Sequence, residues 1–252
     1  MIVLAAHGTR DPAGARVIEE LASRVRARSR GVEVRVAYAD VRAPDVTTVL
    51  ASVLDRSVVV VPAFLAAGYH VRVDIPAQAG ANGHSDVIIA RSFGPAPELV
   101  DAMLERLTTA GYRAGDSVVL AAAGSSDTRA LADVETAAHA LAVRLGTPVR
   151  VGYAATATPT IADIVKQSSG RVAVASWLLA PGLFQRRVRD CGAQVVAGPI
   201  GTHPGVVDLV MRIYRAGCLS RCPRSSGQGC APIALPRSSG HGAPKSLTCG
   251  LV

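Results

Sequence analysis

The sequence predicts an α/β fold built from two tandem flavodoxin-like domains with parallel sheets, related by internal duplication and followed by a disordered C-terminal tail. Three observations support this prediction. Short apolar runs rich in valine alternate with amphipathic segments, as in doubly wound parallel sheets. The order of motifs in the first half recurs in the second half. Finally, 49% of the 252 residues are hydrophobic, which supplies a large core.

The central strand of the first domain is predicted at residues 58–62, where four valines are followed by Pro62. A continuously apolar run of β-branched residues that ends at a proline is typical of a parallel strand buried on both faces. Asp45 is an expected helix cap. In chain order, the other elements predicted for this domain are strands at residues 1–6, 32–38 and 87–90, and helices at residues 15–28, 45–54, from about 74, and 97–110.

The second half repeats this pattern, and the repeat permits an internal comparison. The offset falls slowly from 116 to 114 residues, as two small deletions would cause. Three polar residues of the first half meet apolar residues in the second: His7 corresponds to Ala123, Asp40 to Ala155 and His70 to Phe184. The fold therefore does not require these three polar side chains. We infer that they serve a ligand or a reaction.

The sequence divides into a first domain at residues 1–113, a second at 114–216 that lacks the three polar groups, and a low-complexity tail at 217–252. The tail is rich in Ser, Gly, Pro and Arg, which is a disordered composition. It holds four of the five cysteines, in a spacing that matches no strong zinc or iron-sulfur signature. Because only Cys191 lies in the body, no disulfide framework is expected.

Composition also excludes several classes of function. Of the net charge of +8, half lies in the acid-free tail, so the body is only mildly basic. Aromatic residues make up 4% of the chain and do not alternate with basic runs, which argues against nucleic acid but leaves a small polyanion open. No apolar run approaches the roughly 18 residues that span a bilayer, and Met1 is not followed by a basic signal region. We therefore expect a cytoplasmic, monomeric protein that does not bind membranes.

His7, Asp40 and His70 each follow one of three strands that a flavodoxin-like order places side by side. They should converge at one edge of the sheet. Two imidazoles and a carboxylate with an open position suit a divalent ion such as Fe(II), Co(II), Ni(II) or Zn(II). His84, His139 and His203 lack such a setting, so surface or capping roles are favoured for them.

Three arginines lie within two or three positions of this triad: Arg10, Arg42 and Arg72. Guanidinium groups bind carboxylates bidentately, so the arginines suit a ligand with several carboxylates, although each can also be a solvated surface residue. Tyr38 and Tyr69 supply apolar surface for a flat organic ligand. Phe64 and Leu65 do so as well, although core packing is favoured for these two.

These motifs resemble the CbiX/SirB class of sirohydrochlorin chelatases. The resemblance rests on His-Gly-Thr-Arg-Asp-Pro at residues 7–12, the segment around Tyr38-Ala39-Asp40 and Ala43-Pro44, and Pro-Ala-Phe-Leu-Ala-Ala-Gly-Tyr-His-Val-Arg-Val-Asp-Ile-Pro at residues 62–76. It covers residues 1 to about 215. By this resemblance, His7 and His70 match the catalytic, metal-binding histidines, and Asp40 stands where the family usually has Glu.

The resemblance implies insertion of Fe(II) or Co(II) into sirohydrochlorin, a tetrapyrrole with eight carboxylates, without ATP. The chain contains no Gly-x-x-x-x-Gly-Lys-Ser/Thr loop, in keeping with no use of a nucleotide. Two alternatives stay open at this point. A carrier of metal or tetrapyrrole would use the same ligands without turnover. A histidine phosphatase also has a His-Gly turn after its first strand, but it would have Arg where this chain has Ala6.

Overall fold

The computed structural model describes residues 1–81 and 83–221, which form one compact unit. Cys222–Val252, which contain most of the expected tail, lie outside the described residues. The first half contains, in chain order, β1 (Ile2–Ala6), α1 (Pro12–Ser29), β2 (Val34–Tyr38), α2 (Val46–Ala51), β3 (Val58–Pro62), the π-helix η1 (His70–Asp74), α3 (Ile75–Gly80), β4 (Val87–Ile89) and α4 (Pro97–Thr109).

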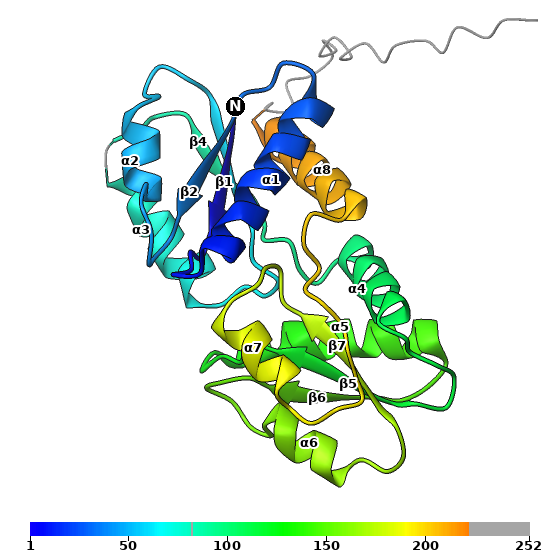
Figure 1. Cartoon of the computed structure of the whole chain (residues 1–252). Coiled ribbons are helices and arrows are strands. Elements are labelled where there is room, and N and C mark those ends of the chain that lie inside the picture. Colours follow the sequence, from blue (N-terminus) through cyan, green and yellow to red (C-terminus); the bar gives the residue numbers. More distant parts are fainter. Residues whose placement is uncertain (82, 222–252) are drawn as a thin grey trace, which may run out of the picture. The chain divides into compact units, whose positions relative to one another are not determined.

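The second half repeats this succession of strands and helices, except for the π-helix. Its elements are β5 (Ser117–Ala122), α5 (Thr128–Leu145), β6 (Val149–Tyr153), α6 (Ile161–Gln167), β7 (Val172–Trp177), α7 (Leu183–Arg189), β8 (Val195–Val196) and α8 (Pro204–Ser220). The two tandem parallel-sheet domains predicted from the sequence are therefore confirmed (Figure 1).

The two sheets have equivalent strand orders, β2-β1-β3-β4 and β6-β5-β7-β8, and all their pairings are parallel. The predicted adjacency of the first three strands is thus correct. β1 and β3 are buried along their whole length, as expected for central strands covered by helices on both faces. Parallel pairing brings the carboxyl ends of all four strands of a sheet to one edge, where the loops that carry the polar residues begin.

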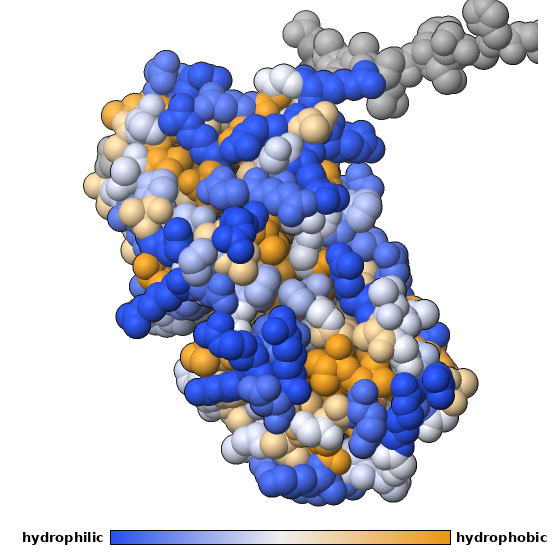
Figure 2. Space-filling model, viewed as in Figure 1, coloured by the Kyte–Doolittle hydropathy of each residue, from blue (hydrophilic) through white to orange (hydrophobic). Residues whose placement is uncertain are grey.

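Each sheet is covered by helices on both faces. On the outer faces, α2 and α3 pack on the first sheet and α6 and α7 on the second. On the inner faces, one hydrophobic cluster runs through both halves and includes residues of α1, α4, α5 and α8. Figure 2 shows hydrophilic residues over much of the visible surface, with hydrophobic residues in patches between them.

The last helix of each half packs on the sheet of the other half. α4 follows β4 in sequence but contacts β7, whereas α8 follows β8 but contacts β3 and lies beside α1 (Figure 1). At Gly217 in α8, an added Cβ would lie 2.9 Å from Val59 Cγ1, which shows how closely this helix approaches β3. The two sheets are therefore joined by exchanged helices as well as by the chain that connects them.

The observed boundaries differ from the prediction by three or more residues at three places. α1 begins at Pro12, because the Asp11 side chain accepts a hydrogen bond from Ala13 N and caps the helix there. α2 ends at Ala51, three residues early. The tail was expected from residue 217, but α8 continues to Ser220, and the Arg221 side chain donates to the carbonyl of Val58. Residues 217–221 belong to the folded body.

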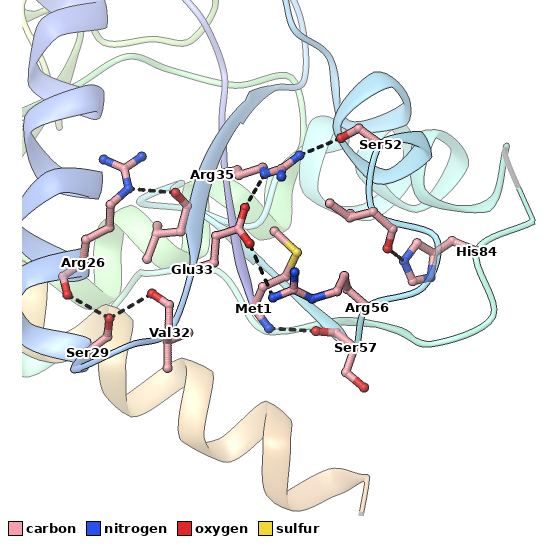
Figure 3. Close-up of polar contacts among 12 residues, drawn as sticks. Met1, Arg26, Ser29, Val32, Glu33, Arg35, Ser52, Arg56, Ser57 and His84 are labelled. Carbon is pink, nitrogen blue, oxygen red and sulfur yellow. Dashed lines mark hydrogen bonds and ion pairs between the residues drawn. The ribbon is translucent and has the colours of Figure 1, made fainter.

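The end of the first sheet opposite the polar loops is held by backbone and charged contacts (Figure 3). The Met1 ammonium donates to Ser57 O at 2.7 Å, and Glu33 pairs with Arg35 and Arg56. A ring nitrogen of His84 lies 3.0 Å from Val53 O. This end is therefore occupied by structural contacts.

No helix among the described residues is long and apolar enough to cross a bilayer.

Candidate functional site

The loops after β1 and β2 bring His7 and Asp40 together. Gly8 has a φ of +96°, and a Cβ there would lie 2.2 Å from Asp40 O, so only glycine permits this approach. Asp40 N donates to His7 O at 3.0 Å, which fixes the two loops side by side. The Asp40 carboxylate in turn accepts from Val41 N at 2.7 Å. Val41 has a φ of +65°, which β-branched residues rarely adopt.

His70 reaches the same point from the loop after β3. One ligand atom from each of His7, Asp40 and His70 lies within 4.8 Å of the other two. The two imidazole centroids are 4.4 Å apart in an edge-to-face arrangement, and Phe64 lies beside both rings. The predicted convergence of the three residues is confirmed. Their role as metal ligands stays a prediction.

The residue that orients His70 was not among the predicted site residues. Residues 70–74 form a π-helix, which places Asp74 on the same side as His70. Nδ1 of His70 lies 2.5 Å from Asp74 Oδ2, and both side chains are 29% exposed. This contact leaves Nε2 of His70 free to bind a ligand. The His-x-x-x-Asp spacing at residues 70–74 was the available signal.

Electrostatics around His7 favour its neutral form. Protein atoms around the ring partly desolvate it and lower the pKa of His7, and the neighbouring His70 imidazole lowers that pKa further. Nδ1 of His7 lies 3.1 Å from Gly8 O, so it is the donor in that hydrogen bond and Nε2 is left with a lone pair. A neutral imidazole with a free lone pair is the form that binds a metal ion.

His7 and His70 of the triad border a cleft of about 570 Å³ between the two halves. His7, Phe64, Tyr69 and His70 line one wall. The segment at residues 177–184, which is equivalent to the one that leads to His70, lines the other. Apolar side chains dominate both walls, and no arginine or lysine is among the described residues that line the cleft. Asp40 borders a second, more open hollow on its far side.

The expected ligand-binding arginines and tyrosines have different surroundings. Arg10 is exposed and makes no hydrogen bond or ion pair within residues 1–81 and 83–221. Arg42 donates to Thr9 O at 3.1 Å and lies over the ring of Tyr38, its Cζ 5.8 Å from the centroid. Tyr38 lines the cleft but is largely buried. This burial, together with the charge of Glu19, raises the pKa of Tyr38.

Arg72 is not among the described residues that line the cleft, and its role in binding a ligand stays a prediction. Its guanidinium pairs with Asp127 of the second half and donates to Ala67 O. Tyr69 does line the cleft and is 62% exposed. The remaining histidines agree with the expectation where their contacts are described: His139 is exposed on α5, and His203 caps α8 by accepting from Gly205 N.

Two half-chains of the same α/β fold, with a polar triad in one of them, define a chelatase-like protein. The family model described as CbiX matches residues 1–110 and again residues 117–216. The chain therefore belongs to the CbiX family, as its motifs predicted. A search of curated proteins finds no significant match.

Solved structures share the fold across most of both chains. SirB from Bacillus subtilis with Fe³⁺ has a TM-score of 0.73 at 20% identity, covering 86% of this chain and 94% of SirB. The sirohydrochlorin chelatase SirB from Bacillus subtilis subspecies spizizenii with cobalt has a TM-score of 0.73 at 20% identity, with 87% and 95% covered. A CbiX described as the terminal enzyme of siroheme biosynthesis in denitrifying bacteria has a TM-score of 0.67 at 24% identity, with 85% and 98% covered.

Proposed function

We propose that this protein is a sirohydrochlorin chelatase that inserts Fe(II) or Co(II) into the macrocycle without ATP, in sirohaem or cobalamin biosynthesis. The observation that carries the proposal is the meeting of His7, Asp40 and His70 at the edge of a mainly apolar cleft, in a chain of the CbiX family. A cleft of about 570 Å³ suits a flat organic ligand. Iron and cobalt, which are named for the similar SirB structures, are among the metals that this donor set suits.

The reaction exchanges two N–H bonds of the macrocycle for bonds from its nitrogens to the metal, and two protons leave. His7 and His70 hold the incoming ion through their free ring nitrogens, and Asp40 adds a negative charge that favours the cation. As the ion passes to the macrocycle, the imidazole lone pairs become free. They can then accept the two pyrrole protons. The lowered pKa of His7 favours release of its proton to water afterwards.

The second half supplies the opposite wall of the cleft in this proposal. Ala123 and Phe184 line that wall where the first half has His7 and His70, so the wall offers contact surface and no metal ligands at these positions. The macrocycle would lie between the two walls with one face toward the histidines. We propose one metal site per chain.

An anaerobic insertion assay with sirohydrochlorin tests the function. Fe(II) and Co(II) are supplied separately, and the absorbance of the metallated product is followed over many enzyme equivalents. Product in excess of enzyme identifies a chelatase, and the ratio of the two rates identifies the preferred metal. Product limited to one equivalent, or metal bound without insertion, would instead identify a carrier.

A further inference from the structure

The walls of the cleft are connected by two ion pairs that the internal repeat relates to each other. Arg72 of the first half pairs with Asp127 of the second, and Arg186 of the second half pairs with Asp11 of the first. Arg72 and Arg186 are equivalent positions, 114 residues apart, and Asp11 and Asp127 are equivalent positions, 116 apart. Both aspartates cap the long helix after the first strand of their half. The two pairs are thus reciprocal, as across a twofold axis.

The surroundings of the two pairs are unequal. Arg72 and Asp127 are 27% and 17% exposed, and Arg72 also donates to Ala67 O. Ala67 N then donates to Asp133 Oδ2 at 2.8 Å, which adds a second bond between the walls. We call this group the hinge contacts. They hold one side of the cleft through several hydrogen bonds.

The hydrogen bond between Ala67 and Asp133 has no possible equivalent on the other side. Pro181 occupies the position of Ala67 and has no N–H, and Val17 occupies the position of Asp133 and has no carboxylate. Arg186 bonds to Asp11 alone among the described residues, at 2.8 Å, with side chains 56% and 21% exposed. We call Arg186 and Asp11 the latch pair. Within residues 1–81 and 83–221 it is the only ion pair between the walls on this side, and water reaches it.

The latch pair lies next to the cleft. The loop before Arg186 lines the cleft as far as Gln185, and Thr9, which lines the opposite wall, is two residues from Asp11. The walls touch here: a Cβ on Gly14 would lie 2.5 Å from Pro181 O. Because no arginine or lysine is among the described lining residues, an anionic ligand in the cleft must find its cationic partners at the rim. Arg186 is such a rim residue.

We propose that Arg186 is a substrate-binding residue that exchanges Asp11 for a carboxylate of the ligand. The identity of the ligand, a polycarboxylated tetrapyrrole, rests on the proposed function. A guanidinium in a half-exposed pair changes partner at little cost, because water already screens the pair. The incoming carboxylate can accept from Arg186 with both oxygens, whereas Asp11 uses only Oδ2 for Arg186 because its Oδ1 accepts from Ala13 N. Exchange also frees the latch side of the cleft, while the hinge contacts keep the other side closed.

If Arg186 exchanges Asp11 for a carboxylate of the ligand, substitutions of Asp11 and of Arg186 should change ligand affinity in opposite directions. Asp11→Asn keeps an oxygen that can cap α1 but no longer competes for Arg186, so an octacarboxylated porphyrin should bind about three- to fivefold more tightly. Arg186→Gln removes the cationic partner, so the same porphyrin should bind about three- to fivefold more weakly. The double variant should match Arg186→Gln. Binding is measured by quenching of porphyrin fluorescence at constant ionic strength, and thermal midpoints confirm folding.

Arg189→Gln is the matched control, because it removes an exposed arginine from the same helix without touching the latch pair. It should change binding by less than either test variant. If Asp11→Asn and Arg186→Gln shift porphyrin affinity in the same direction, or if neither shifts it, the pair only braces the walls and the proposal is overturned. Co(II) affinity of each variant is measured alongside. If the two variants shift porphyrin affinity in opposite directions but the protein inserts no metal, the proposed role of Arg186 stands and the proposed chelatase function is wrong.

Discussion

The two halves of this protein share their scaffold down to unusual backbone detail, yet only one carries the triad. Gly124 repeats Gly8, with a φ of +95° and an added Cβ only 1.9 Å from the carbonyl of Ala155. Thr156 repeats the left-handed backbone of Val41, with a φ of +60°. Because the second half keeps these conformations without the side chains of the triad, the fold itself requires them. The histidines and Asp40 are additions to that scaffold.

The comparison also separates two tasks that a single-domain site would combine. The first half places three potential ligands on one wall. The second half, freed from that task, presents apolar residues on the opposite wall. We interpret the duplication as a division between binding the ion and enclosing the macrocycle.

The strongest test of this division removes the histidines of the first half. His7→Ala or His70→Ala should lower metal insertion at least about 100-fold, because removing a metal ligand or a general base has effects of that size. Thermal midpoints should move by only a few degrees, since these side chains lie at the cleft surface. Steady-state insertion rates and calorimetry measure both quantities. Near-normal rates in both single variants would contradict the assignment.

The reciprocal change is the control for that experiment. Ala123→His combined with Phe184→His should create at most a weak extra Co(II) site and no additional turnover, because Ala155 still lacks the carboxylate of Asp40. Co(II) titration of the unmodified protein should give one site per chain at the cleft, and the site should disappear in the His7→Ala/His70→Ala double variant. Two equivalent sites in the unmodified protein would show that the halves are not specialised.

Asp74 marks a second difference between the halves, since its equivalent in the repeat is the buried Val188. Asp74→Asn should weaken Co(II) binding about 10- to 100-fold, because a hydrogen-bonded carboxylate orients the metal-binding imidazole. Asp74→Glu should recover part of this affinity. Co(II) titration distinguishes orientation from folding, provided that the thermal midpoint is unchanged. Equal Co(II) affinity in the unmodified protein and in both variants would show that Asp74 does not orient His70 for metal binding.

Much of the fold and the triad were predictable because each depends on local pattern. The valine run of β3 and the His-Gly turn after β1 identify strand ends, and a parallel sheet brings strand ends together. The π-helix was missed because positions 70, 72 and 74 also fit an extended period of two. The ion pair between Arg72 and Asp127 was not predicted, because it depends on how the two halves pack against each other. The hydrophobic periodicity of the sequence carries no information on that packing.

The exchange of α4 and α8 was unpredictable for a similar reason. Each helix is amphipathic, and its apolar face is equally suited to either sheet. The same exchange explains the error at the tail boundary. The last turn of α8 packs on β3 of the other half, where a glycine is needed, so the Gly217 that suggested a break is a close-packing residue.

Truncation measures how strongly the exchanged helix joins the halves. Ending the chain after Arg221 keeps every contact described above and should leave insertion and thermal midpoint unchanged. Ending it after Ala216 removes the last turn of α8 and the hydrogen bonds from Arg221 to Val58 O and Asp86 O. We expect a loss of about 2 kcal/mol, or roughly 4–8 °C in the midpoint. Equal midpoints would show that residues 217–221 contribute nothing to the body.

An effect of similar size is expected at the contact between the walls on the latch side. Gly14 corresponds to Ala130 of the second half, whose methyl group is accommodated 3.8 Å from the Cβ position of Gly68. At Gly14 itself, a methyl group would lie 2.5 Å from both the Pro181 carbonyl oxygen and Thr9 Cγ2, so Gly14→Ala should cost about 1–3 kcal/mol through overpacking. Gly80→Ala is the control, because a Cβ at this helical glycine meets no atom within 4 Å and should be neutral or slightly stabilising. Chemical denaturation measures both. Equal stability of the two variants would show that the latch-side walls can separate without cost. The close approach at Gly14 would then not define the width of the cleft.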